Sequence, residues 1–435
     1  MLETFRKAWK VPELRKKMLF TLLIIVIFRL GCTIPVPFLD ASKISELMGT
    51  GSFLTYLDTL SGGALSKGTL FALSIQPFIN AQIIIQLLTY ALPPLENLQK
   101  EGEEGRKKIQ KITNVLSLVI SLVMSYAYYL TMRSQGAVKY TAGFDGIFTA
   151  ITIIAVFTAG SSMIVWLGNQ VNDLGIGNGI SIILFAGIVA RGPSGILSMF
   201  SLIQNDKKYI LVVPLVLIVF ILMIGFIVLM NESERRIPIQ YAKRVVGRKQ
   251  YGGQNTHIPI KIAMSGVMPI IFAMAFMSIP ATLELFIKRP TITETSGFWD
   301  KFYNGFLNFF SYTSPWYAVI YFLLIIAFNY FYVSMQYDPV QIANNLRQNN
   351  GGIPGIRPGR PTSDYIRKVL SKITLIGAVC LGIIAIFPII TNKFMPELNI
   401  SMGGTSILII VSVALETVRT LESQMMMRGH KGFLE

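Results

Sequence analysis

Long apolar runs alternate with short polar stretches along almost the whole chain. A helix of about 20 apolar residues reaches across the hydrocarbon core of a bilayer, and the chain has ten apolar runs of 12 to 23 residues. We predict a membrane-spanning helix in each run. The ten predicted spans are residues 18–30, 70–92, 112–131, 146–167, 174–190, 209–230, 262–283, 316–333, 373–390 and 404–415. The pattern therefore predicts an all-α polytopic membrane protein.

The second predicted span, residues 70–92, carries polar groups that lipid alone would not accommodate. Its polar side chains include Gln76, Asn80, Gln82 and Gln86. Pro77 also removes one backbone donor near the start of the span, and polar groups at this depth need a protein partner or water. Ile75 and Ile79, four residues apart, share one face across the proline. We therefore expect this span to line a pore.

The segment before this span, residues 51–68, is too short and too polar to cross the bilayer. It combines an apolar start with Asp58 and Lys67. A half-inserted segment is stable only where protein or water surrounds it, so we interpret this one as a re-entrant helix packed inside the bundle. A helix that lies on the membrane surface is the alternative.

The ten spans divide into two sets of five at the loop around residues 206–208. This division gives an N-terminal half, residues 1–205, and a C-terminal half, residues 206–435. A proline interrupts the second span of each half, Pro77 in the first and Pro269 in the second. Paired interrupted spans in two inverted repeats mark a transport path. We expect two pseudo-symmetric five-helix halves around a central pore.

Lys and Arg residues are distributed unequally between the loops on the two sides of the predicted membrane. One side has 27 of them and the other has 11, and basic residues favour the cytoplasmic side. An even number of spans puts both ends of the chain on one side, so we assign both termini to the cytoplasm. The basic residues before residue 18 resemble the start of a signal peptide. Because no small-residue cleavage site follows, we expect a retained first helix.

The composition agrees with this class, since 52% of the residues are hydrophobic and 14% are charged. A formal charge of +16 also occurs in nucleic-acid-binding proteins, but membrane topology accounts for it here. Cys32 and Cys380 lie far apart, and neither they nor His257 and His430 show the spacing of a metal site or a disulfide framework. We expect no cofactor.

Two loops on the basic side are long, residues 231–261 and residues 338–372. Gly and Pro residues lie in them at the spacings of turns, between basic and aromatic residues. We expect both loops to form ordered hairpins that protrude from the membrane.

The predicted spans carry no ionisable residue away from their ends. Ion-coupled carriers need such residues, because a proton or cation is exchanged against a buried charge. The chain also lacks a P-loop sequence, and the glycines at 175, 177 and 179 lack the strand context of a dinucleotide site. We expect a passive conduit that is not an enzyme, closed by a hydrophobic constriction that excludes water. A small-molecule secondary transporter with inverted repeats is the alternative.

Nine motifs, in their order along the chain, resemble those of the SecY family, the central subunits of bacterial protein-conducting channels. They are FRLGCTIPVP at 28–37, SGGALS at 61–66, IIIQLL at 83–88, EGEEGRKKI at 101–109, GIGNGISII at 175–183, YAKRVVGR at 241–248, THIPIK at 256–261, PGIRPG at 354–359 and GGTSILI at 403–409. The resemblance covers nearly the whole chain. It implies a clamshell of two halves around an hourglass pore, hinged near Asp206.

The resemblance also implies a ring of aliphatic side chains that seals the pore. Its members are Ile75, Ile79, Ile180, Leu184, Ile271 and Ile409. Leu184 replaces an isoleucine of the better-known relatives but keeps the aliphatic character that a seal requires. Residues 53–66 resemble the plug that closes the outer funnel. The plug residues expected to matter are Phe53, Leu57, Leu60, Ser61, Gly62 and Gly63.

The second and seventh spans resemble the lateral gate, through which a signal sequence or a membrane helix reaches lipid. The gate residues are Gln86, Pro77 and Pro269. Gln86 is expected to face the seam, and the alternative is that it bonds to neighbouring helices.

The cytoplasmic loops resemble the docking surface of the family. Arg357, held in a turn, is expected to contact the motor with support from Lys243, Arg244 and Arg248. The implied partners are the SecA ATPase motor, the translating ribosome, the small membrane subunits SecE and SecG, and preproteins that carry a signal sequence. The implied location is the bacterial cell membrane.

Overall fold

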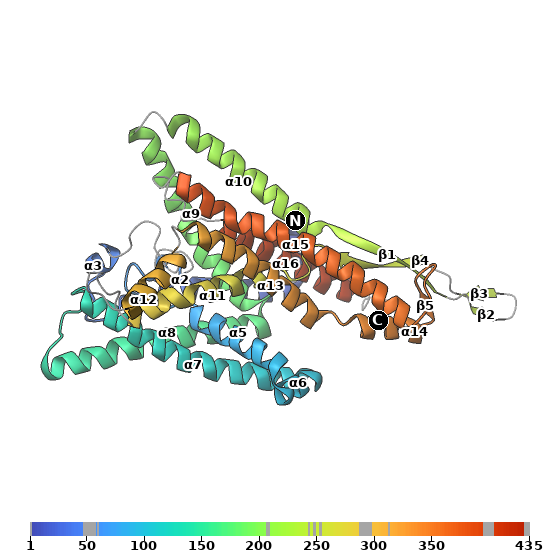
Figure 1. Ribbon diagram of the computed structural model, residues 1–435, viewed down its shortest axis with the longest axis horizontal. Helices are drawn as coiled ribbons and strands as arrows, with labels where there is room; N and C mark the ends of the chain where they lie inside the picture. Colours follow the sequence, from blue (N-terminus) through green and yellow to red (C-terminus); the bar gives the residue numbers. More distant parts are fainter. Residues whose placement is uncertain are drawn as a thin grey trace.

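The chain folds as a bundle of helices with a projecting β structure at one end. The computed structural model describes residues 2–46, 58, 61–205, 209–241, 244–246, 249–251, 255–286, 298–311, 314–394 and 404–429. Within these ranges the long helices run side by side, and the strands extend beyond the bundle (Figure 1). The predicted class, an all-α membrane protein, is confirmed, with a small β addition outside the bundle.

A helix lies at the place of each predicted span. These helices are α2 (Pro12–Gly31), α5 (Gln76–Ala91), α7 (Glu103–Ser134), α8 (Gly143–Leu174), α9 (Gly179–Asn205), α10 (Tyr209–Glu232), α11 (Met268–Phe286), α13 (Pro315–Gln336), α15 (Arg360–Phe394) and α16 (Gly404–Gly429). The shorter helices are α1 (Leu2–Lys10), α3 (Ala41–Glu46), α6 (Pro93–Lys100), α12 (Phe298–Phe309) and α14 (Pro339–Gln348).

By length and composition, the described part of the chain has six helices that could cross a membrane. The number becomes seven if α5 and α6, which are bent by 98° relative to each other, count as one span. The count of ten spans therefore stays a prediction.

The predicted span at residues 70–92 is wrong in its first part. The helix there, α5, begins only at Gln76, and residues 61–75 form a series of turns that is mostly buried. Pro77 lies in the first turn of α5, as Pro269 does in α11. A proline at this position lacks only a donor that the first turn leaves unpaired in any case. Both prolines therefore begin a helix and do not interrupt one.

The turns at residues 61–75 keep backbone groups paired without forming a helix. The Val36 N–H donates to the Gly68 carbonyl at 2.9 Å, and the Leu70 N–H donates to the Ile34 carbonyl at 2.9 Å. Unpaired backbone groups are not tolerated within the hydrocarbon core of a bilayer. These bonds therefore explain how an irregular segment is accommodated inside the bundle.

The loop at residues 231–261 forms the predicted hairpin. Strand β1 (Glu234–Tyr241) pairs antiparallel with β4 (Asn255–Lys261), and Ile237 lies opposite Ile258. Between them, β2 (Arg244–Val246) pairs antiparallel with β3 (Lys249–Tyr251).

The prediction of a hairpin at residues 338–372 is wrong. This loop consists of α14, the two-residue strand β5 (Gly351–Gly352) and the start of α15. The Asp338 side chain caps α14 by accepting from the Val340 N–H at 2.8 Å, and this local signal favours a helix. Strand β5 pairs with the free edge of β1, and the sheet order β4-β1-β5 joins the two long loops into one structure.

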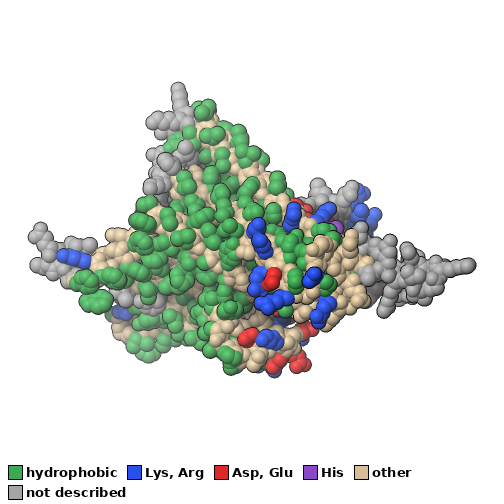
Figure 2. All heavy atoms as spheres, turned by 45° about the vertical axis from the view of Figure 1, so that its right-hand side comes forward, with side chains coloured by type: hydrophobic (Ala, Val, Ile, Leu, Met, Phe, Trp, Pro, Cys, Tyr) green, Lys and Arg blue, Asp and Glu red, His purple; other side chains and the backbone are tan. Residues whose placement is uncertain are grey.

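Apolar side chains cover the outside of the bundle as well as its core. Figure 2 shows them over most of the visible bundle surface, while Lys and Arg side chains gather mainly toward the end that carries the strands. On α10, Leu211 is 81% exposed and Ile221 is 68% exposed. An apolar surface of this extent suits contact with lipid.

The N-terminal and C-terminal helices meet at one end of the bundle. Ala8 of α1, Leu14 of α2 and Leu421 of α16 share a buried apolar cluster. The first and last described helices therefore pack against each other.

Candidate functional site

The predicted ring residues lie at the beginnings of four helices. They are Ile75 directly before α5, Ile79 in the first turn of α5, Ile180 and Leu184 at the start of α9, Ile271 near the start of α11 and Ile409 in the second turn of α16. All six belong to a single apolar cluster. The starts of four helices from different parts of the chain thus converge at one place in the bundle.

Burial in this cluster is nearly complete. Ile75, Ile79, Leu184 and Ile409 are between 0% and 5% exposed, and Ile180 and Ile271 are partly buried against them. Aliphatic side chains offer no hydrogen bond to water, so a constriction made of them can exclude water without binding any substrate.

A cavity of about 10 Å³ lies among four of the six residues. Ile79, Leu184, Ile271 and Ile409 line it together with Gln76, Met274 and Ala275. Its volume is about that of a single water site. Gln76, Ile79 and Leu184 also line a second cavity of about 10 Å³, on the side of α7. The packing at the convergence of the helices is therefore not complete, and small spaces remain between facing side chains.

Ile180 lies in the same cluster but does not line this cavity. A Cβ atom added to Gly168 of α8 would lie 3.1 Å from Ile180 Cγ1. The glycine thus permits a close approach of α8 and the start of α9. The structure brings four predicted ring residues around one cavity and places Ile75 and Ile180 in the surrounding packing.

The described part of the predicted plug consists of Asp58 and residues 61–66. Residues 61–66 form turns, so the prediction of a helix through residue 66 is wrong. Gly62 and Gly63 have φ angles of +68° and +86°, a left-handed conformation that glycine adopts without steric strain. The other predicted plug residues, Phe53, Leu57 and Leu60, lie outside the described residues.

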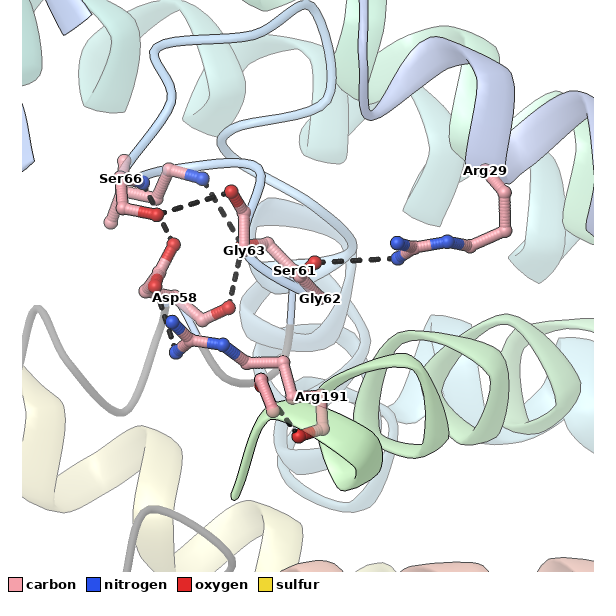
Figure 3. A network of polar contacts seen from close by, with 9 residues as sticks. Arg29, Asp58, Ser61, Gly62, Gly63, Ser66 and Arg191 are labelled. Carbon is pink, nitrogen blue, oxygen red and sulfur yellow. Dashed lines mark hydrogen bonds and ion pairs between the residues drawn. The ribbon is translucent and has the colours of Figure 1, made fainter. Parts of the chain in front are cut away.

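Asp58 organises these turns (Figure 3). Its carboxylate accepts from the Ser66 N–H at 2.7 Å and forms an ion pair with Arg191 Nη1 of α9 at 2.8 Å. Its carbonyl oxygen accepts from the Gly63 N–H at 2.8 Å and from the Ser61 hydroxyl at 3.0 Å. Asp58 is only 1% exposed. A carboxylate buried to this extent is stable only when it is paired and hydrogen-bonded.

Helix α2 holds the same turns from another side. Arg29 Nη1 donates to the Gly62 carbonyl oxygen at 3.3 Å, and Cys32 Sγ lies 3.7 Å from the Ser61 carbonyl oxygen. The segment is therefore fixed between the end of α2 and the middle of α9.

The pair of Asp58 and Arg191 is a feature that the sequence did not reveal. The absence of ionisable residues was predicted for the spans alone, and Arg191 directly follows the predicted span at 174–190. Because α9 continues to Asn205, Arg191 lies within the helix and meets a buried carboxylate. The sequence signal that could have indicated a buried ion pair is the single Asp in the otherwise uncharged stretch 53–60.

Gln86 lies on α5, which packs against α11 and α7. Its Oε1 atom is buried and has no hydrogen-bond partner among the described residues, so this oxygen does not make the predicted alternative bond to a neighbouring helix. Leaving a buried acceptor unpaired costs about 1–3 kcal/mol.

Helix α5 contacts helices of the C-terminal half where the seam between the halves is predicted. Farther along α5, the Tyr90 ring meets the Phe331 ring of α13 edge-on, with centroids 5.7 Å apart. Pro77 and Pro269 are buried at the starts of α5 and α11. Helix α5 therefore meets α11 and α13 of the C-terminal half along this seam.

Arg357 is exposed in the turn between β5 and α15. Gly355 in this turn has a φ angle of +80°, and the Arg357 carbonyl accepts from the Thr362 hydroxyl at 2.8 Å. The turn is thus fixed by its backbone, as predicted from its Gly and Pro residues. Of the other predicted docking residues, Arg244 lies in β2, while Lys243 and Arg248 lie outside the described residues.

Charged groups connect the base of the β hairpin to the bundle. Arg419 Nη2 of α16 pairs with Glu232 Oε1 at 2.9 Å and donates to the Asn231 carbonyl at 2.9 Å. Partial burial, and then the nearby Arg419, lower the pKa of Lys261, while Glu232 and Glu234 act in the opposite direction. These contacts fix the hairpin relative to α10 and α16.

Comparison with known proteins assigns the chain to a family. The SecY family model matches residues 69–418. The chain is 40% identical over 448 residues to the protein translocase subunit SecY of Streptomyces scabiei, and the match covers 100% of both chains. It is 39% identical to the protein translocase subunit SecY of Thermotoga maritima, over 100% of this chain and 98% of that one.

Solved structures show the same fold at lower sequence identity. A structure described as that of a protein-conducting channel superimposes with a TM-score of 0.64 at 20% identity, covering 96% of each chain. Sec61 in the canine ribosome–channel complex superimposes with a TM-score of 0.61 at 20% identity, also over 96% of each chain. The family match over most of the chain, the full-length relatives and the common fold agree, and the chain belongs to the SecY family.

Proposed function

We propose that the chain is the central pore-forming subunit of the general protein secretion channel. It passes unfolded polypeptides across the membrane and releases signal sequences and membrane helices sideways into lipid. The observation that carries this proposal is the convergence of aliphatic side chains from four helix starts around one small cavity. Aliphatic side chains bind no particular chemical group of a substrate, so a polypeptide of any sequence can pass once the seal widens.

Three parts of the chain have separate roles in this conduit. The six ring residues seal it, residues 53–66 close its outer side as a plug, and the seam between α5 and α11 opens toward lipid. The unpaired Gln86 oxygen lowers the cost of opening this seam, because separation of the helices would expose that oxygen to water or to a polar group of the passing chain. The two halves, residues 1–205 and 206–435, move about the loop near residue 206.

A passive conduit needs a driver that docks on its cytoplasmic side. Exposed Arg357 is the proposed contact for a SecA-type ATPase motor or a translating ribosome, with Lys243, Arg244 and Arg248 beside it. Arg presents a planar fork of donors that suits carboxylates and phosphates. The likeness to Sec61 in a ribosome–channel complex supports the ribosome as a partner. Small subunits of the SecE and SecG type complete the channel, and preproteins with signal sequences are its cargo.

The proposed location is the bacterial cell membrane, with both termini in the cytoplasm. The distribution of 27 basic residues on one side and 11 on the other supports this orientation. In this proposal the docked motor or ribosome supplies the energy, and the chain serves as a passive conduit.

The test is transport by the purified chain, with its copurified small subunits, in lipid vesicles. With a SecA-type motor and ATP, a preprotein added outside should become protected from protease, and it should stay accessible without ATP. Uptake of small solutes should not respond to an ion gradient. Solute uptake coupled to such a gradient, without preprotein protection, would assign the chain to the transporter class.

A further inference from the structure

The strongest unexplained feature is the charged network beside the seal. Asp58 forms the ion pair with Arg191 at 2.8 Å, and the side chain of Asp58 is 2% exposed while that of Arg191 is 26% exposed. Both carboxylate oxygens are used, since the other one accepts from the Ser66 N–H. The network joins Asp58 to the turns that follow it and to α9, whose first turns carry Ile180 and Leu184.

The backbone of the same turns touches α9 directly. A Cβ atom added to Gly62 would lie 2.9 Å from the Gly187 carbonyl oxygen of α9 and 2.5 Å from Arg29 Nη1. Gly187 and Arg191 are four residues apart and therefore share one face of α9. The turns are thus held by an ion pair and by a close backbone contact on the same helix face.

We propose that the Asp58–Arg191 ion pair, together with the Arg29–Gly62 hydrogen bond, is a latch that holds Asp58 and the turns at residues 61–66 in the closed position. This inference rests on the proposed function, and it names the groups that set how readily the conduit opens (Figure 3). Displacement of the segment separates Asp58 from Arg191. In the closed state the buried Asp58 carboxylate is both ion-paired and hydrogen-bonded, as a buried charge requires, and displacement of the segment breaks the ion pair.

The turns held by the latch also cover a cysteine of the chain whose chemical modification can report opening. Cys32 is 3% exposed, and its Sγ atom lies 3.7 Å from the Ser61 carbonyl oxygen. Movement of the turns at residues 61–66 uncovers this thiol. The rate at which a small maleimide modifies Cys32, with Cys380 replaced by Ala, therefore measures how often the latch opens.

The experiment is a double-mutant cycle in the purified complex with its small subunits. The variants are Asp58→Asn, Arg191→Gln and the double variant, with Lys67→Gln as the matched control, because Lys67 is an exposed charge in the same segment. Resting conductance in planar bilayers and the Cys32 modification rate are both measured. Thermal unfolding of each variant verifies that it is folded.

Each single substitution removes the ion pair, so we expect each to raise conductance and Cys32 modification by roughly tenfold. The double variant should exceed neither single variant, because the same interaction is lost in all three, and Lys67→Gln should match the wild type in conductance. Wild-type values in folded single variants, or effects that add in the double variant, would overturn the latch.

A second variant keeps the latch testable if Asp58→Asn does not fold. This variant carries Asp58→Cys and Arg191→Cys in a background with Cys32→Ala and Cys380→Ala. A short bis-maleimide joins the two introduced cysteines. Joining should stop ATP-driven protection of the preprotein, and the unjoined protein should still transport. Undiminished transport after joining would contradict the latch. Failure of the wild type to transport would instead contradict the proposed function.

Discussion

Ile271 and Ile180 are both predicted ring residues, but their surroundings differ. Ile271 lines the central cavity, whereas Ile180 packs beside Gly168 of α8. Replacing Ile79, Ile180 and Ile271 together by Asn should wet the constriction and raise the resting ion conductance of planar bilayers, since amides hold water where aliphatic groups exclude it.

Single substitutions provide the internal control for this prediction. Ile271→Asn should raise the conductance more than Ile180→Asn, because only the former puts an amide into the cavity. A triple variant as tight as the wild type, even with residues 53–66 deleted, would mean that these side chains are ordinary packing.

For single residues, the sequence predicted which side chains line the seal better than it predicted which side chains pair with each other. The spacing of Ile75 and Ile79 indicated a shared face, and the family resemblance indicated which residues of other helices would join them. Asp58 and Arg191 lie far apart in the sequence, and no local pattern relates one buried charge to another. Such a pair depends on how distant elements pack, so only the structure revealed it.

Among the elements, the start of α5 illustrates the limit of hydrophobic patterning. Residues 70–75 are as apolar as the helix that follows, and the pattern therefore extended the helix through them. Burial selects for apolar side chains in turns as well as in helices, so hydropathy cannot separate the two. Pro77 and Pro269 were the better guides, because proline is favoured in the first turn of a helix.

The short strand β5 gives a testable link between the two cytoplasmic loops. A Cβ atom on Gly351 would lie 2.9 Å from the Tyr241 ring of β1, while one on neighbouring Gly352 would meet nothing within 4 Å. Gly351→Val should therefore push β5 and the Arg357 turn away from β1. Overpacking of this kind costs about 1–3 kcal/mol.

We expect Gly351→Val to weaken binding of the motor by about fivefold, which corresponds to about 1 kcal/mol, and Gly352→Val to bind as the wild type does. Titration of the motor onto vesicles that contain each variant measures this difference. Equal affinities for the two variants would show that the pairing of β1 with β5 does not position the docking turn.

For the whole molecule, the orientation in the membrane is the main untested prediction. Single cysteines at positions 243 and 357 should react with an impermeant maleimide only from the cytoplasmic side, and those at 139 and 207 only from outside. Labelling of position 207 from the cytoplasmic side alone would contradict the ten-span topology.

The class of the molecule was predictable because bilayer thickness dictates the length of apolar runs. The joining of the two long loops into one sheet was not predictable, because the pairing of strands from distant segments depends on tertiary packing and not on the local sequence of either strand. The convergence of four helix starts at the ring likewise depends on packing across the whole bundle.

The most direct test of the proposed path is photocrosslinking from the ring to a polypeptide arrested during transport. A photoreactive residue at position 271 or 409 should crosslink to the arrested chain, and only when the motor and ATP are present. The same residue at position 222 of α10, where Leu222 is 66% exposed on the outer surface, should not crosslink to it. Crosslinks from position 222 with none from positions 271 and 409 would contradict a path through the ring.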